Sequence, residues 1–151
     1  MKKNNFIKKI LSSKHPYIIA EIGINHNGKI NLAKKMILEA KKCGANCVKF
    51  QKFIANDYIS KFAPQANYQK QHRRFKNKNQ RDIIKKSQLD IKSIVILKRF
   101  SKKNNIDFLC TPFETKSLKS LLDIGIDAIK ISSDNLNNIS FLKEAANSKL
   151  P

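Results

Sequence analysis

Four short apolar runs, each ending in a group of polar side chains, constrain the fold of this 151-residue chain more than any other feature. They lie at 18–28, 47–51, 108–114 and 128–133. Each run is long enough for one buried strand, and a helix-like spacing of apolar residues follows each run. Strands that alternate with helices run parallel, so the polar groups after them meet at one edge of the sheet. We expect the ligand site at that edge.

The spacing predicts four strand–helix units. The expected strands begin at Ile18 and then cover 46–51, 106–111 and 127–132. The expected helices begin with one capped by Asn31 and ending at Gly44, followed by 88–104, 115–123 and 139–148. Four such units form half of a TIM-type α/β barrel with parallel strands. We expect 1–16 to be an N-terminal extension and 17–151 to be part of a barrel, truncated before its fifth strand. The long connection at 52–87 is either a functional lid or disordered.

The charge balance favours a dispersed basic surface. The chain has 31 Lys and Arg against 11 Asp and Glu, a net charge of +20, and its lysines occur in nearly every segment. The most concentrated basic run, 70–86, contains one aromatic residue, Phe75. Nucleic-acid binding usually combines clustered charge with stacking aromatics, so we expect no nucleic-acid partner and keep charge-driven binding as a less favoured alternative.

The N-terminus and the cysteines favour a soluble, cytoplasmic protein. Lys8 and Lys9 interrupt the first apolar stretch, and no stretch approaches the roughly 20 apolar residues that cross a bilayer. Cys43, Cys47 and Cys110 are odd in number and lack the spacing of a zinc site. We therefore expect free thiols in a reducing compartment and no membrane partner.

Several side chains in the polar groups could carry chemistry. Lys49 and Lys130 lie within apolar runs, where an ammonium is costly unless it meets an anion; anion binding is favoured over extension to the rim. Ser132 and Ser133 could donate to that anion or simply cap a turn. Glu21 could hold a sugar hydroxyl, transfer a proton or pair with a neighbouring lysine.

His26 lies in the loop after the first run and has no second histidine at metal-binding spacing. A hydrogen-bonded structural role is therefore favoured over one in which it polarises a carbonyl group. Gly23 and Gly28 permit tight turns but do not form a dinucleotide-binding fingerprint.

Four motifs closely resemble the N-terminal half of the sialic acid synthases, the N-acylneuraminate synthase family. They are Glu21-Ile22-Gly23-Ile24-Asn25-His26-Asn27-Gly28, Val48-Lys49-Phe50-Gln51, Thr111-Pro112-Phe113-Glu114 and Lys130-Ile131-Ser132-Ser133. Their order and spacing agree with the family from about Tyr17 onward. The resemblance implies a TIM barrel that condenses phosphoenolpyruvate with an open-chain N-acylated hexosamine of the mannosamine type and releases phosphate.

The resemblance also implies roles for particular residues. Matched by motif, Lys49, Lys130 and Ser133 would bind phosphoenolpyruvate, while Glu21 and Gln51 would contact the sugar, with Glu21 catalytic. A divalent metal, usually manganese, would act as a Lewis acid on the sugar aldehyde, and the residues that bind this metal would lie outside this chain. The complete enzyme would be a homodimer. The chain departs from the family at 134–135, where Asp-Asn replaces Gly and an acidic residue. The alternative is a non-catalytic sugar- or phosphate-binding or assembly module.

Overall fold

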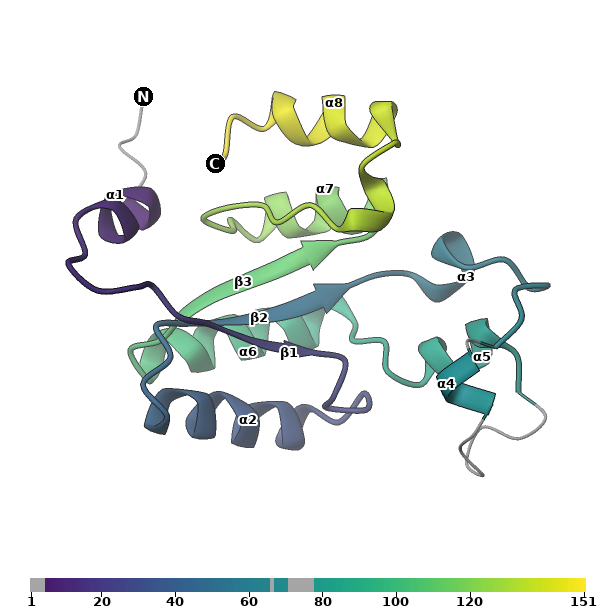
Figure 1. Ribbon diagram of the computed structural model, residues 1–151, viewed down its shortest axis with the longest axis horizontal. Coiled ribbons are helices and arrows are strands. Elements are labelled where there is room, and N and C mark those ends of the chain that lie inside the picture. The colour runs from purple at the N-terminus through teal and green to yellow at the C-terminus, as the bar shows by residue number, and fades with distance from the viewer. Residues whose placement is uncertain (1–4, 66, 71–77) are drawn as a thin grey trace.

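A parallel sheet forms the centre of the computed structural model, which describes residues 5–65, 67–70 and 78–151 (Figure 1). Within those residues the strands are β1 (Ile19–Gly23), β2 (Cys47–Lys52) and β3 (Asp107–Pro112), in the order β1-β2-β3. Ile19 pairs with Cys47, and Cys47 pairs with Asp107, so the strands begin level with one another. The expected α/β architecture with parallel strands is confirmed.

The longer helices follow the strands in the order that the apolar spacing predicts. They are α2 (Ile30–Lys42), α6 (Ile91–Lys103), α7 (Thr115–Asp123) and α8 (Ile139–Asn147). Asp90, Glu114 and Asn138 each accept a hydrogen bond from a backbone N–H in the first turn of α6, α7 and α8, respectively. The expected cap at Asn31 is wrong, because α2 begins after Lys29 and Asn31 lies inside it.

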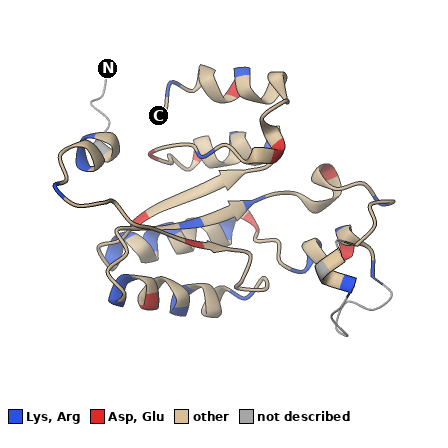
Figure 2. Cartoon of the chain, viewed as in Figure 1, with Lys and Arg blue, Asp and Glu red and all other residues tan. Residues whose placement is uncertain are grey.

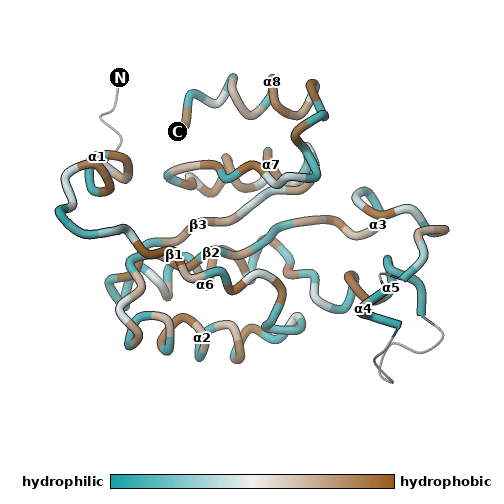
Figure 3. The backbone as a smooth tube through the Cα atoms, in the orientation of Figure 1, coloured by the Kyte–Doolittle hydropathy of each residue, from teal (hydrophilic) through white to brown (hydrophobic). Residues whose placement is uncertain are grey.

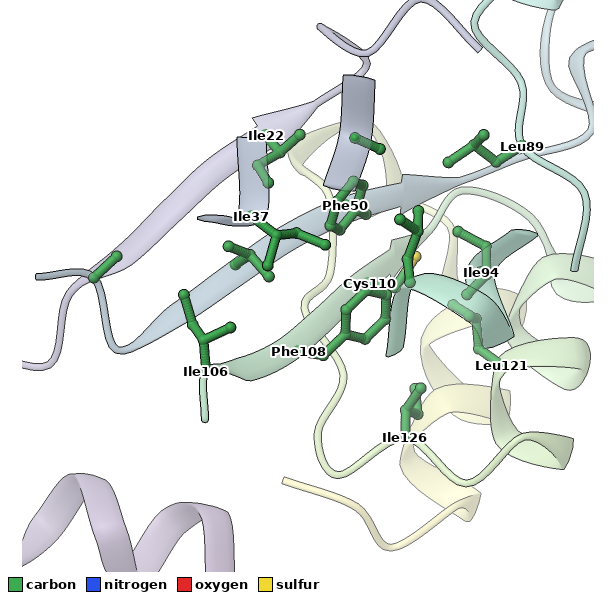
Figure 4. Close-up of a cluster of buried hydrophobic side chains, with 14 residues drawn as sticks. Ile22, Ile37, Phe50, Leu89, Ile94, Ile106, Phe108, Cys110, Leu121 and Ile126 are labelled. Atoms are coloured by element: carbon green, nitrogen blue, oxygen red, sulfur yellow. The ribbon is translucent and has the colours of Figure 1, made fainter. Parts of the chain in front are cut away.

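Successive residues of each strand point to opposite faces of the sheet, and one face carries the main core (Figure 4). Phe50 and Phe108 stack on this face with ring centroids 5.4 Å apart. Ile37 of α2 and Ile94 of α6 are fully buried against them, and α2 and α6 also pack on each other. Burial of this apolar surface fixes the strands from one side and leaves the opposite face for other groups.

The opposite face is closed at the amino-terminal end of the sheet by α1 (Asn5–Leu11), a helix that the sequence pattern did not predict. Phe6 of α1 packs beside Tyr17 against a small cluster that contains Cys47 and Leu109. Asp107 accepts hydrogen bonds from the Tyr17 hydroxyl and from Lys9 Nζ, the latter at 2.5 Å. These contacts attach α1 to the end of the sheet that lies away from the polar motifs.

The expected fourth strand at 127–132 does not form. In the described part of the chain this segment has no ladder with β3; instead the Ile129 N–H donates to the Pro151 carbonyl at 2.8 Å. Lys98 Nζ donates to the carbonyls of Ile124 and Gly125 at 2.8 and 2.5 Å and so fixes the turn before the segment. A groove of about 630 Å³ extends from α6 past the start of β3 to Asp127. The Ile129 N–H therefore has a partner other than β3.

The long connection at 52–87 contains helical turns. They are α3 (Ala55–Tyr58), α4 (Asn67–Lys70) and α5 (Gln80–Lys85). Residues 66 and 71–77, which include part of the basic run, lie outside the described residues. Lys and Arg residues occur on helices throughout the described part of the chain (Figure 2). Hydropathy alternates along α2 and α6 (Figure 3), and none of the described helices has the length and apolar character needed to cross a membrane.

Candidate functional site

Glu21 and Lys49 form an ion pair near the middle of β1 and β2, on the face of the sheet opposite the main core. The two residues are register partners on β1 and β2, so the strand pairing itself brings their side chains together. The Lys49 side chain is 12% exposed, whereas that of Glu21 is 49% exposed. A lysine covered to this extent needs a counter-charge, and Glu21 supplies one that water also reaches. The pairing of Glu21 with a neighbouring lysine is thus observed.

The side chains of Gln51 and Glu21 both lie next to Gly23, at the end of β1. A Cβ atom at Gly23 would be 3.4 Å from Glu21 Oε1 and 3.5 Å from Gln51 Nε2. Gly23 has a φ of +56°, which L-residues rarely adopt, and the β1–β2 register shifts between Glu21 and Gly23. This irregularity ends β1 with two polar side chains close together. Three of the predicted site residues, Glu21, Lys49 and Gln51, therefore share one site.

Thr111 extends the site onto β3. It belongs to one of the four family motifs, but the sequence alone predicts no role for its side chain. Thr111 is the register partner of Gln51 and is 2% exposed. Its Oγ1 is buried and has no hydrogen-bond partner among the described residues. Such a group is costly unless a ligand or water satisfies it. The available sequence signal was its position at a strand end, directly before a proline.

Lys130 and Ser133 are not joined to this cluster. Both are exposed, and no hydrogen bond or ion pair links either side chain to Glu21, Lys49 or Gln51 in the ranges that the structure describes. The reason is the missing fourth strand, which would have continued the register from β3. Their roles in phosphoenolpyruvate binding stay predictions.

The residues directly after Ser133 are held by neighbouring loops. Asp134 Oδ2 accepts a hydrogen bond from the Tyr58 hydroxyl at 2.7 Å and a longer one from Ser132 Oγ at 3.3 Å. Asn135 is 5% exposed, and its Nδ2 donates to the Phe113 carbonyl at 3.1 Å. Burial raises the pKa of Tyr58, and its hydrogen bond to Asp134 raises that pKa further. The carboxylate of the altered family motif is therefore engaged by Tyr58.

His26 occupies a structural position in the loop after β1. It is fully buried, its ring lies 5.9 Å from that of Phe50, and its Nδ1 accepts a hydrogen bond from the Gly28 N–H at 3.0 Å. Nε2 has no hydrogen-bond partner in the described part of the chain. Burial lowers the pKa of His26, with a weaker opposing effect from the Gly23 carbonyl. The contacts with Gly28 and Phe50 agree with a hydrogen-bonded structural role.

The two buried cysteines do not offer an activated nucleophile. Cys47 and Cys110 are buried free thiols, and burial raises the pKa of Cys47 to about 12 and that of Cys110 as well. Metal binding also lacks a donor set: residues 5–65, 67–70 and 78–151 contain no group of three His, Cys, Asp or Glu that could hold an ion. The manganese that the resemblance implies, on ligands outside this chain, stays a prediction.

Comparison with known proteins identifies relatives with named activities. The N,N'-diacetyllegionaminic acid synthase of Legionella pneumophila is 35% identical over 150 residues, covering 99% of this chain and 42% of the relative. The synthase of the same name from Campylobacter jejuni is 42% identical over 133 residues, covering 88% and 40%. The crystal structure of N-acetylneuraminic acid synthetase from Leptospira borgpetersenii, in complex with citrate, superposes with a TM-score of 0.74 at 35% identity, covering 89% and 42%.

The chain thus spans about two fifths of the length of the relatives that it matches. A family model described as "NeuB family" matches residues 36–151. This match includes β2, β3 and the segment with Lys130 and Ser133, while the relatives extend the similarity over nearly the whole chain. The chain belongs to the NeuB family.

Proposed function

We propose that this chain forms the amino-terminal part of a site that condenses phosphoenolpyruvate with an open-chain N-acylated hexosamine to give a nonulosonic acid. The observation that carries the proposal is the covered Lys49 ammonium, paired with a half-exposed Glu21 on the face of the sheet opposite the main core. An anionic ligand can reach such a lysine by displacing the carboxylate. Relatives named as synthases of diacetyllegionaminic and N-acetylneuraminic acids support the choice of reaction.

The proposed reaction forms one carbon–carbon bond and releases phosphate. C3 of phosphoenolpyruvate attacks the sugar aldehyde carbon, and the aldehyde oxygen takes up a proton. Water adds to the cationic C2 and loses a proton, and the C2–O bond to phosphate then breaks as the C2 carbonyl forms. Lys49 would neutralise the anion, and Glu21, once displaced, would hold a sugar hydroxyl or transfer a proton, beside Gln51. Lys130 and Ser133 would bind the anion from the segment after α7.

The proposal assigns no metal ligand to this chain. Manganese stays an expectation from the family resemblance, and no step above is routed through it. We also propose a cytoplasmic location, in line with the free thiols of Cys43, Cys47 and Cys110.

Calorimetry with phosphoenolpyruvate tests the anion site. We expect Lys49→Met to weaken binding at least tenfold, because hydrogen-bonded charge pairs are among the strong polar contacts. Glu21→Gln should bind the anion as well as or better than the parent, because it removes the competing carboxylate. The matched control is Lys42→Met, which breaks an exposed lysine–glutamate pair of 2.8 Å on α2 and should leave binding unchanged.

Two outcomes would contradict the proposal. Either a folded parent chain fails to bind phosphoenolpyruvate, or Lys49→Met binds it as tightly as the parent. Phosphate release with N-acetylmannosamine and manganese then distinguishes catalysis from binding. Tight binding without release from any protein that contains this chain would favour the binding module.

A further inference from the structure

The loop after β2 provides a hydroxyl donor in a fixed position. Tyr58, the last residue of α3, packs edge-on against Phe113 with ring centroids 4.8 Å apart, and Phe53 lies 6.1 Å from Phe113. The Ile54 N–H donates to Glu114 Oε1 at 2.8 Å. These contacts attach α3 to the junction between β3 and α7. The Tyr58 hydroxyl is therefore positioned by the carboxyl-terminal ends of two strands.

The segment with Ser133 depends on side-chain contacts for its position. It has no ladder to β3 among the described residues, so backbone pairing does not align it with the sheet. Two hydrogen bonds link the short 3₁₀ helix η2 (Ser133–Asn135) to the strand ends: Tyr58 to Asp134, and Asn135 to the Phe113 carbonyl. The first ends on a charged acceptor, which makes it the stronger type of bond.

We propose that Tyr58 and Asp134 are positioning residues, whose hydrogen bond holds Ser133 and Lys130 in place for phosphoenolpyruvate. This inference rests on the proposed function. Asp134 is the carboxylate of the altered family motif, and its Oδ2 accepts hydrogen bonds from Tyr58 and Ser132. Its role in this proposal is to align the segment that carries Ser133. Tyr58 itself acts through Asp134 and touches no reacting atom in this scheme.

The test compares four variants by their dissociation constant for phosphoenolpyruvate. Tyr58→Phe removes only the hydroxyl, Asp134→Ala removes the acceptor, and the double variant removes both. We expect each to weaken binding by at least about tenfold, the lower end for one hydrogen bond to a charged group. The double variant should match the single ones, because all three break the same bond. Asp134→Asn keeps an acceptor oxygen and should restore most of the affinity.

A matched control lies at the other end of the sheet. Tyr17→Phe also removes a tyrosine hydroxyl that donates to an aspartate, Asp107, and should leave phosphoenolpyruvate affinity unchanged. Hydrogen exchange provides a second readout without ligand. The N–H groups of Asn135 and Leu136, which bond to the carbonyls of Ser132 and Ser133, should exchange faster in Tyr58→Phe and not in Tyr17→Phe.

The two proposals fail in distinguishable ways. If the parent binds phosphoenolpyruvate and Tyr58→Phe binds it equally well, the positioning role is overturned while the proposed function stands. If the parent does not bind it, the proposed function is overturned, and the role of this bond in binding falls with it. In that case unchanged exchange at 135 and 136 would also overturn the structural part of the inference.

Discussion

Replacing Gly28 by alanine should destabilise the fold considerably more than the same change at Gly44. The φ angles are +74° at Gly28 and +84° at Gly44, and alanine in this left-handed region costs about 1–2 kcal/mol at either position. Around Gly44 the added Cβ would meet no described atom within 4 Å, so strain is the whole cost there. At Gly28 the added methyl would overlap the Lys86 carbonyl oxygen.

That carbonyl cannot move away freely, because the turn that follows α5 is held on both sides. The Ser87 N–H donates to the Ile84 carbonyl at 2.9 Å, and the Gln88 N–H donates to the Lys85 carbonyl at 3.2 Å. The Gln88 side chain accepts from the Ala55 N–H at 2.9 Å. Displacing this turn would weaken one or two of these bonds at about 1 kcal/mol each. With the strain included, Gly28→Ala should cost about 3 kcal/mol in total.

The assay is urea unfolding of the parent and both variants under identical conditions. Because both variants carry a similar left-handed alanine, the difference between their free energies of unfolding isolates the contact with Lys86. We expect Gly28→Ala to be less stable than Gly44→Ala by about 1–2 kcal/mol. Equal losses would show that the first loop does not pack against the turn at 86–88, and the reasoning would be refuted.

Three further predictions concern single side chains. Burial lowers the pKa of His26 below 6.5, so the unfolded chain binds more protons than the folded one below that pH, and the free energy of unfolding should decline as the pH falls below 6.5. In urea unfolding between pH 7 and 5, His26→Asn should flatten this slope, and an unchanged slope would contradict the lowered pKa of His26. Asp90→Ala removes the N-cap of α6 and should lower the free energy of unfolding by about 1 kcal/mol. Asp123→Ala is the control, and an equal loss in both variants would show that Asp90 does not stabilise α6 as a cap. Lys49→Met should change the free energy of unfolding by less than about 1 kcal/mol, because water solvates the Glu21 carboxylate that is left behind. Global unfolding of this variant would instead mark Lys49 as a structural residue.

Elements with strong local patterns could be predicted from the sequence. The expected helix at 115–123 is observed with the same bounds, and β2 differs from its expected range by one residue at each end. In both cases apolar spacing within the element determines which side faces the core. The sequence pattern predicts Glu21 and Lys49 on neighbouring strands, and the strand register pairs them within β1 and β2.

Features that depend on distant partners could not be predicted. The run at 128–131 has the composition of a strand, yet a ladder also requires neighbouring backbone at the correct distance. Helix α1 is stabilised by Asp107, which lies 98 residues beyond Lys9. Tyr58 and Asp134 are 76 residues apart and share no periodic pattern. The fold brings these groups together, and no local rule in the sequence marks them as partners.

One strand contributes to both the core and the candidate site, and this gives the proposed anion site its physical basis. Val48 and Phe50 are fully buried against the helices, and they fix the backbone on either side of Lys49. The intervening side chain must therefore emerge on the opposite face, where it is only 12% exposed. Desolvating an ammonium there is unfavourable, and Glu21, itself half in water, offsets that cost only in part. A neutral sugar would leave Lys49 less compensated than Glu21 does, whereas an anion would compensate it more fully. The same burial that stabilises β2 thus supports the proposal that Lys49 binds an anion.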